Sequence, residues 1–396
     1  MSVVTVQKAD VGSLVKNNIR NYSMFIMLAL IMIVFAFLTG GTNLNSRNFT
    51  NIFIQYGYVL ILAVGMVQVI IVGGIDLSVG SVCAFVGAIS AMVYNAGAGL
   101  LVTLLVAIVV GVAIGAFQGF WSSYLRMPSF IVTLAGMLLF RGLTYLITNV
   151  NPISLKDDGY KQLASGMADI SSLQVGGVHL TAIILGLVVF AIFVITEMIG
   201  RRRKIQNNFE ITPMPFFIGK LLVIGVLILA LAQRFATYRG LPTVVVVLGI
   251  TVLVFHFMMM NTVLGRYIYA VGGNARSAKL SGINSELVVF LVFCIMGGLS
   301  GLAAVISTGY MNSALPQAGN LFEMDAIAAC YIGGVSASGG IGTVVGVIIG
   351  GLVMSAINNG MSLMNLGQHW QYVVKALILL LAVFYDVYTR RKSGLG

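Results

Sequence analysis

The feature that most constrains this chain is a series of long apolar runs, each close to twenty residues and nearly free of charge. An α-helix needs about 20 apolar residues to cross a bilayer, whereas outer-membrane β-strands are about 10 residues of alternating polarity. Only 8% of the 396 residues are charged and the mean hydropathy is +1.02, so a soluble fold would lack a hydrated surface. The sequence therefore predicts an all-α, polytopic transmembrane helical bundle.

Twelve such runs can be distinguished. They cover residues 22–39, 51–72, 78–95, 100–122, 129–148, 179–199, 216–235, 241–260, 286–308, 321–338, 341–362 and 370–388. The run at 321–338 carries Glu323 and Asp325, and the run at 78–95 starts beside Asp76. Either of these two runs could be a half-helix or a re-entrant segment. We therefore expect about 10–12 spans with helix breaks, in a single transmembrane domain over residues 1–396.

Basic residues cluster at the ends of the apolar runs. The clusters are Lys8, Lys16 and Arg20; Arg201, Arg202, Arg203 and Lys204; Arg266, Arg276 and Lys279; and Arg390, Arg391 and Lys392. Cytoplasmic loops of membrane proteins are enriched in such residues, which explains the net charge of +11 without a nucleic acid partner. The pattern predicts that both termini are cytoplasmic, with a tail over 1–21, and that the acidic segment 149–178 lies outside.

Two glycine-rich stretches resemble each other. VGGIDLSVGS at 72–81 and IGGVSASGGI at 332–341 share Gly-Gly, Ser and Gly at matching offsets, and each follows an apolar run. A helix break at membrane depth is tolerated only inside protein or beside a water-filled cavity, and it is a common way to build a solute path. The candidate pathway residues are Gly73, Gly74, Asp76, Ser78, Glu323, Asp325, Gly333, Gly334, Asn358 and Asn359.

Two roles remain open for Asp76. As the N-cap of a helix that begins at Leu77, its carboxylate would accept a backbone N–H and complement the helix dipole. At a helix break that faces the pathway, Asp76 and Ser78 would instead offer acceptors to a polar solute. We do not expect an acid that does neither, because an unpaired charge at the bilayer centre costs about 2.5–3.5 kcal/mol. The two roles can coexist.

The segment 261–285, predicted to be cytoplasmic, contains a compact helix candidate. Asn274 suits the N-cap position, residues 275–280 favour a helix, and Gly282 suits the position after its end. Ala275, Ala278 and Leu280 would form a small apolar surface beside basic residues. One interpretation is a membrane-surface loop whose arginines only set the topology. The other is a helix that docks on a cytoplasmic partner, which an ATP-driven process would need because the chain has no P-loop motif.

The sequence contains no motif typical of an enzyme. It shows no pairing of a nucleophile with a base, and its three histidines, His179, His256 and His369, are too far apart to suggest a metal site. The three cysteines lie in apolar runs, where buried packing is the expected role. We expect no catalytic residue, metal or cofactor.

Four stretches together resemble the permease subunits of bacterial monosaccharide ABC importers, the ribose/xylose permease family. They are GGIDLSVGS at 73–81, RMPSFIVTLAGMLLFRG at 126–142, GRYIYAVGGNARSAKLSGIN at 265–284 and EMDAIAACYIGGVSASGGIGTVVGVIIGG at 323–351. The resemblance covers nearly the whole chain, in order. The segment 179–240, with an extra pair of apolar runs, resembles the insertion of the xylose and multiple-monosaccharide branch.

The resemblance implies a function and a set of partners. It implies an inner-membrane permease, paired as a homodimer in membrane lipid, with a cytoplasmic ABC ATPase and a periplasmic or lipid-anchored sugar-binding protein. It places the ATPase contact in the cytoplasmic segment. The residues concerned are Gly265, Arg266, Gly272, Gly273, Asn274, Arg276, Ala278, Lys279 and Gly282.

Two other function classes are compatible with the residues. An ion-coupled secondary sugar transporter would use Asp76, Glu323 and Asp325 as coupling acids, and its uptake would follow a membrane gradient instead of ATP. A membrane scaffold would transport nothing, and would have no reason for paired glycines at helix breaks.

Overall fold

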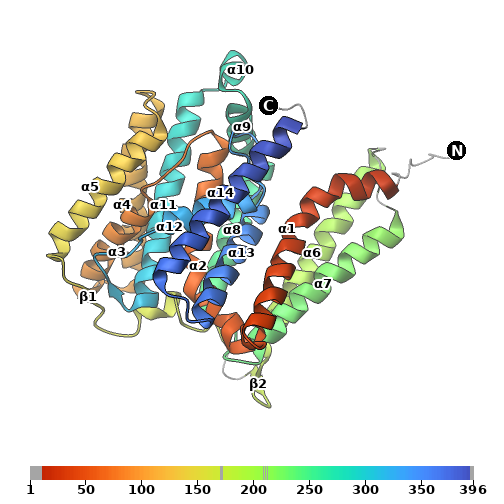
Figure 1. Cartoon of the computed structure of the whole chain (residues 1–396), viewed down its shortest axis with the longest axis horizontal. Helices are drawn as coiled ribbons and strands as arrows, with labels where there is room; N and C mark the ends of the chain where they lie inside the picture. Colours follow the sequence, from red (N-terminus) through yellow and green to blue (C-terminus); the bar gives the residue numbers. More distant parts are fainter. Residues whose placement is uncertain (1–10, 170–172, 208, 210, 212, 393–396) are drawn as a thin grey trace.

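The apolar runs form a bundle of long helices (Figure 1). The computed structural model describes residues 11–392 except 170–172, 208, 210 and 212. The helices are α1 (Val11–Leu38), α2 (Ser46–Ile71), α3 (Val79–Asn95), α4 (Leu100–Ser123), α5 (Ser129–Thr148), α6 (Leu180–Gln206), α7 (Met214–Ala236), α8 (Thr243–Asn261), α9 (Val263–Gly273), α10 (Ala275–Leu280), α11 (Ser285–Met311), α12 (Phe322–Ile332), α13 (Val344–Leu363) and α14 (Gln368–Lys392). Short elements are η1 (Thr42–Leu44), η2 (Tyr160–Leu163), β1 (Ile153–Ser154), β2 (Gln174–Val175), β3 (Val178–His179) and β4 (Ser313–Ala314).

Among the described residues, nine helices are long and apolar enough to cross a membrane. Two shorter apolar helices, Met24–Leu38 within α1 and Val79–Asn95, join them. The chain is therefore a multi-pass membrane protein, and the predicted helical bundle is confirmed. Residues 11–21 of the predicted N-terminal tail are the first turns of α1, and their cytoplasmic location remains a prediction. The basic side chains predicted at Lys8, Lys16, Arg20 and 390–392 lie outside the described residues.

The predicted run at 321–338 forms only the short helix α12. Its 11 residues span about 17 Å, roughly half of the hydrocarbon core. Leu321, with a φ of 65°, stands in the left-handed region just before the helix, and Gly334, with a φ of 80°, follows its end. The ring of Phe322 packs 4.4 Å from that of Tyr58, at the midpoint of α2. Helix α12 therefore starts halfway through the bundle.

The two ends of the bundle carry different elements (Figure 1). The start of α1, the end of α14, the α6–α7 connection and α10 lie at one end, which we call the α10 end. Strands β1 and β2 lie at the opposite end. The start of α1 and the end of α14 lie at the same end of the bundle, which agrees with the predicted even number of membrane crossings. That the α10 end faces the cytoplasm remains a prediction from the basic clusters.

Helix α2 is the centre of the core. Every residue from Gly57 to Ile71 is buried, and the helix packs against α8, α11, α12 and α13. Helices α4 and α11 approach closely because glycines face each other. A Cβ atom at Gly111 would overlap the carbonyl of Gly297, and one at Gly115 that of Phe293. Such small-residue contacts are typical of helix packing in lipid, where no hydrophobic force drives helices together.

The segment 149–178 folds against the bundle at the end opposite α10. Tyr160 in η2 is fully buried, and its hydroxyl lies 2.6 Å from the hydroxyl of Ser90 in α3. Asp157 at the surface accepts hydrogen bonds from the Tyr94 hydroxyl and the Gly159 N–H, which lower the pKa of its carboxyl. Strand β1 pairs antiparallel with β4, so this segment is also joined to the chain that follows α11.

Helices α6 and α7 form a pair at the periphery. They pack on each other, and α7 contacts α2 through the ring of Phe235, which lies 5.8 Å from Phe49 and 5.4 Å from Phe53. Ala182 is the one buried residue of α6 among those described. This geometry supports reading 179–240 as an extra helix pair, and its origin as an insertion remains a prediction.

Candidate functional site

The first helix break joins α2 to α3 through residues 72–78. Gly73 adopts a φ of 83°, which favours glycine. The backbone N–H of Ile75 donates to Ser129 Oγ at 3.1 Å, and that of Leu77 donates to Thr133 Oγ1 at 3.1 Å. Two hydroxyls of α5 thus replace the hydrogen bonds that a continuous helix would make, so the irregular backbone is accommodated inside protein.

Asp76 closes a turn within this break. Its Oδ1 accepts the N–H of Ser78 at 2.8 Å and the hydroxyl of Ser78 at 2.7 Å. The Gln118 side chain of α4 donates to Ser78 Oγ at 2.8 Å. All three side chains are buried. Helix α3 begins at Val79 instead of Leu77, because residues 75–77 hydrogen-bond to α5. The predicted N-cap position was therefore wrong, although Asp76 does bind a backbone N–H beside the helix start.

The second break lies before α12, in residues 312–321. Arg141 of α5 holds this segment by donating to the carbonyls of Pro316 at 3.0 Å and Ala318 at 2.6 Å. Gly319 packs directly against Gly80 of α3, and a Cβ atom on either glycine would overlap the carbonyl of the other. The starts of α3 and α12 therefore meet in the middle of the bundle.

The two glycine-rich stretches also meet, at the α10 end. The Gly340 N–H donates to the carbonyl of Ile71, the last residue of α2, at 2.9 Å. Gly272, in the last turn of α9, lies against the same Ile71 carbonyl and the Gly340 nitrogen, with no room for a Cβ atom. Three segments that are far apart in the sequence thus share one close backbone contact.

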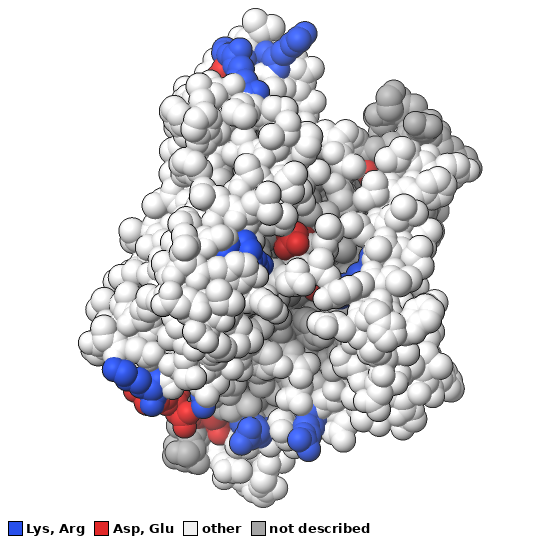
Figure 2. Space-filling model, turned by 60° about the vertical axis from the view of Figure 1, so that its left-hand side comes forward, with Lys and Arg blue, Asp and Glu red and all other residues white. Residues whose placement is uncertain are grey.

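Charged side chains gather at the start of α12. Asp325 is 5% exposed, and its Oδ2 pairs with Lys375 Nζ of α14 at 2.8 Å. Glu323 is 8% exposed, and Arg141 is close enough to attract its carboxylate. Figure 2 shows acidic and basic atoms together in a hollow midway along a face that is otherwise uncharged between its ends.

Part of this cluster lacks hydrogen bonds. Asp325 Oδ1 and both polar atoms of the Asn358 amide are buried without a hydrogen-bond partner among the described residues. Asn358 faces the Asp325 carboxylate without reaching hydrogen-bonding geometry. Asn359 is different, because its amide exchanges hydrogen bonds of 2.8 and 3.0 Å with Asn48 of α2. Buried groups without partners suit a bound water or a hydroxyl-bearing ligand.

Several residues of these breaks were not predicted. Arg141 and Lys375 were visible as single charges inside the apolar runs 129–148 and 370–388. Such charges usually mark a functional or paired position. The hydroxyls of Ser129 and Thr133 gave no comparable signal, because these residue types are common in membrane helices.

The helix predicted in the segment 261–285 is α10. Asn274 Oδ1 accepts the N–H of Ser277 at 3.0 Å, as an N-cap, and Gly282 has a φ of 83°. One part of the prediction was wrong: Ala278 is buried, because α10 packs against α9 and α11. Ala275 is exposed and Leu280 is 90% exposed, so these two residues form the accessible apolar surface. Gly265, at the other end of α9, packs against the last carbonyls of α8.

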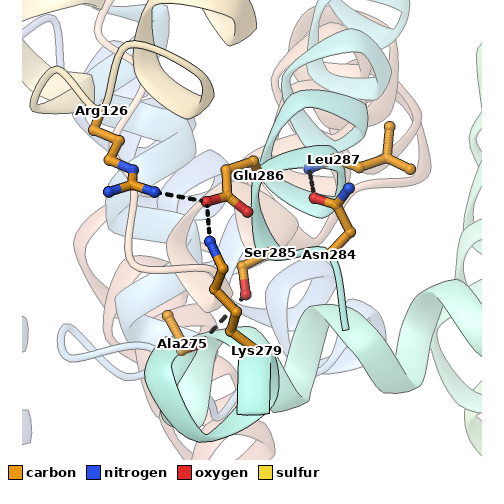
Figure 3. A network of polar contacts seen from close by, with 7 residues as sticks. All are labelled: Arg126, Ala275, Lys279, Asn284, Ser285, Glu286 and Leu287. Carbon is orange, nitrogen blue, oxygen red and sulfur yellow. Dashed lines mark hydrogen bonds and ion pairs between the residues drawn. The ribbon is translucent and has the colours of Figure 1, made fainter. Parts of the chain in front are cut away.

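A polar network ties α10 to the bundle (Figure 3). Lys279 Nζ and Arg126 Nη2 donate to the same oxygen of Glu286, at 2.8 and 3.0 Å. The Ser285 hydroxyl donates to the Ala275 carbonyl at 3.3 Å. The basic partners are 58% and 74% exposed, so each ion pair contributes under about 1 kcal/mol. A cavity of about 410 Å³ beside this network reaches from α10 to Val72 in the first break.

The chain is similar to transport permeases over most of its length. The profile of the family described as branched-chain amino acid transport system / permease component matches residues 48–383. The xylose transport system permease protein XylH of Escherichia coli (strain K12) is 39% identical over 94% of each chain. That of Haemophilus influenzae is 37% identical over 95% of this chain and 98% of its own. The ribose import permease protein RbsC of Escherichia coli (strain K12) is 34% identical over 92% of each chain. No solved structure matches the chain.

Proposed function

Since the chain belongs to the family of branched-chain amino acid transport system permease components, we propose that it is the membrane permease subunit of an ATP-driven monosaccharide importer. Its relatives named as xylose and ribose permeases cover nearly all of the chain, which favours a pentose as the substrate. The chain would form the translocation pathway in the bacterial inner membrane, as a homodimer. ATP hydrolysis would belong to a separate cytoplasmic ABC ATPase, and a sugar-binding protein would deliver the substrate from outside.

The observation that carries this proposal is the contact of Gly272 with both glycine-rich stretches. Helix α9 leads directly into α10, the exposed helix on which an ATPase would dock. A displacement of α10 would therefore reach Ile71 and Gly340, where the two glycine-rich stretches meet, without passing through flexible side chains. Close backbone packing transmits movement because it has little room to yield.

The substrate would pass the polar cluster at the start of α12. Asp325 Oδ1 and the Asn358 amide offer hydrogen-bonding groups without a partner, which suits the hydroxyls of a sugar. Gly73, Gly74, Ser78, Gly333 and Gly334 would shape the pathway through the backbone, and Glu323 would lie beside it. The Oδ1 atom of Asp76 is engaged within the first break, where it would hold the turn.

An ion-coupled sugar transporter is less well supported. Two of its three coupling acids already have partners: Asp76 accepts hydrogen bonds from Ser78, and Asp325 pairs with Lys375. The test is uptake of radiolabelled xylose and ribose into proteoliposomes that contain the permease, its ATPase and its binding protein. We expect uptake to need ATP and to persist when ionophores collapse all ion gradients. Uptake that survives removal of ATP and stops with the ionophores would establish the secondary transporter instead.

A further inference from the structure

Helix α14 has a polar contact near each end of the short helix α12. At the start of α12, Lys375 Nζ pairs with Asp325 Oδ2 at 2.8 Å. Beyond the end of α12, Asp386 Oδ2 accepts the backbone N–H of Ala337 at 3.1 Å. Ala337 belongs to the second glycine-rich stretch. Helix α14 therefore joins the polar cluster in the middle of the bundle to a loop at the α10 end, where α14 itself ends (Figure 1).

The spacing of the two contacts fits the length of α12. Lys375 and Asp386 are 11 residues apart in the sequence, which is about three turns of α14 and about 16 Å along its axis. Helix α12 is also 11 residues long. Positions three turns apart lie on one face of a helix. One face of α14 thus carries both polar contacts.

Apolar side chains fill the space between the two contacts. Ala328 and Ile332 of α12 belong to a buried cluster with residues of α13. Four side chains of α14 pack on this cluster: Val374, Ile378, Leu379 and Ala382. The contact between α12 and α14 is therefore apolar in its middle and polar at each end. If α14 slid along α12, both polar contacts would break together.

The loop that Asp386 binds also touches two other helices. The Gly340 N–H donates to the carbonyl of Ile71 in α2 at 2.9 Å. The Tyr269 hydroxyl of α9 donates to the carbonyl of Gly342 at 2.7 Å. The hydrogen bond to Asp386 adds α14 to the helices that hold this loop. A displacement of α9 that moved the loop would therefore act on α14 as well.

We propose that α14 clamps α12 and the second glycine-rich stretch into one moving body, with Asp386 as the positioning residue at the α10 end. A hydrogen bond from a backbone N–H to a carboxylate is directional, so it fixes the position of the loop more closely than apolar packing does. The inference rests on the proposed transport function. In that function the clamped body would move the Asp325 side chain whenever the loop moves.

The first test compares Asp386→Ala with Asp386→Asn in the full chain. Asparagine keeps an oxygen acceptor for the Ala337 N–H, and alanine does not. Amide hydrogen exchange over residues 335–343 measures how firmly the loop is held, and it needs no transport. We expect Asp386→Ala to exchange about fivefold faster than the parent, the effect of losing one hydrogen bond. Asp386→Asn should exchange at the parental rate.

Reconstitution with the ATPase and the binding protein then measures the sugar imported for each ATP hydrolysed. Asp386→Ala should import about fivefold less sugar per ATP, and Asp386→Asn should match the parent. Parental exchange and parental import in Asp386→Ala would overturn the proposal. If the parent itself imports no sugar, the proposed function fails, and the exchange measurement still decides whether Asp386 holds the loop.

A covalent tether tests whether the loop and α14 move together. Ala337→Cys with Asp386→Cys is joined by a short bismethanethiosulfonate, and the two single variants with the same reagent control for the native cysteines. We expect the joined protein to import sugar at the parental ratio to ATP, and the unjoined double variant to resemble Asp386→Ala. Import that stops on joining would overturn the clamp, because the loop and α14 would then have to separate during transport.

Discussion

At the scale of single residues, Asp76 is held by hydrogen bonds inside its own turn. Its Oδ1 accepts two hydrogen bonds from Ser78, and Ser78 is in turn bonded to Gln118. An asparagine can accept the same bonds, whereas an alanine leaves the buried Ser78 N–H without its acceptor. The presence of a hydrogen-bond acceptor at this position, more than its charge, should therefore decide the stability of the protein.

We expect the free energy of unfolding of Asp76→Asn to lie within about 1 kcal/mol of that of the parent. This variant should also keep transporting sugar. Asp76→Ala should lose about 1–3 kcal/mol, because it leaves the N–H of Ser78 buried and unpaired. Unfolding of the purified protein in mixed micelles measures both variants, and proteoliposome uptake measures transport. A stable Asp76→Asn protein that transports nothing would show instead that the charge acts in the pathway.

The ion pair of Asp325 with Lys375 permits a sharper separation of structure from function. Lys375→Met would leave the buried carboxylate unpaired, which costs about 3–5 kcal/mol. Adding Asp325→Asn removes that charge and should restore most of the stability. If Asp325 Oδ1 and Asn358 meet the substrate, the stable double variant will still lose sugar uptake. Normal uptake by the double variant would limit this pair to a structural role.

These residues also show what the sequence can predict. Lone charges in apolar runs are visible by composition, so Glu323 and Asp325 were identified before their partners were known. The partner Lys375 lies 50 positions further along, and only the packing of α12 against α14 brings them together. The burial of Ala278 was missed for a similar reason: a helix of 6 residues has no repeating pattern that reveals its inner face.

At the scale of elements, one contact between two glycines brings the start of α3 against the segment that leads into α12. The sequence predicted breaks at the paired glycines Gly73-Gly74 and Gly333-Gly334. Gly80 and Gly319, which join the first break to the segment before α12, lie outside those pairs. They were not predicted, because a glycine in a glycine-rich chain gives no sign of what it faces. Secondary structure could thus be predicted from local patterns. The contact between Gly80 and Gly319 could not, because it depends on the tertiary fold.

We expect Gly80→Ala to separate α3 from α12, because its Cβ would overlap the Gly319 carbonyl. Its apparent melting temperature should fall and sugar uptake should decrease. Gly142→Ala on α5 is the matched control, since a Cβ there meets nothing within 4 Å. Both changes raise helix propensity, so propensity cannot explain a difference between them. Equal stability of the two variants would contradict the importance of the glycine contact.

At the scale of the whole molecule, the arrangement connects one end of the bundle to its centre. Helix α10 is exposed at that end, α9 links it to Gly272, and Gly272 touches Ile71, just before the first break, and Gly340, in the second glycine-rich stretch. The ion pairs around Glu286 are exposed and weak, so they orient α10 without fixing it rigidly. If the proposed ATPase docks on α10, this helix on a rigid backbone contact would be suited to convert its movement into opening of the pathway.

Neighbouring glycines at the end of α9 test this connection. Gly272→Ala would push the Ile71 carbonyl and the Gly340 nitrogen apart, whereas Gly273→Ala places its Cβ where nothing lies within 4 Å. We expect both variants to insert and to co-purify with the ATPase, because the exposed residues Ala275 and Leu280 are unchanged. Gly272→Ala should hydrolyse ATP while importing sugar at least tenfold more slowly, a loss of about 1.4 kcal/mol in coupling. Gly273→Ala should import at the parental rate. If Gly272→Ala imports sugar as fast as Gly273→Ala, a movement of α10 does not reach the pathway through Gly272. The contacts around the cavity between α10 and Val72 would then be the next to test.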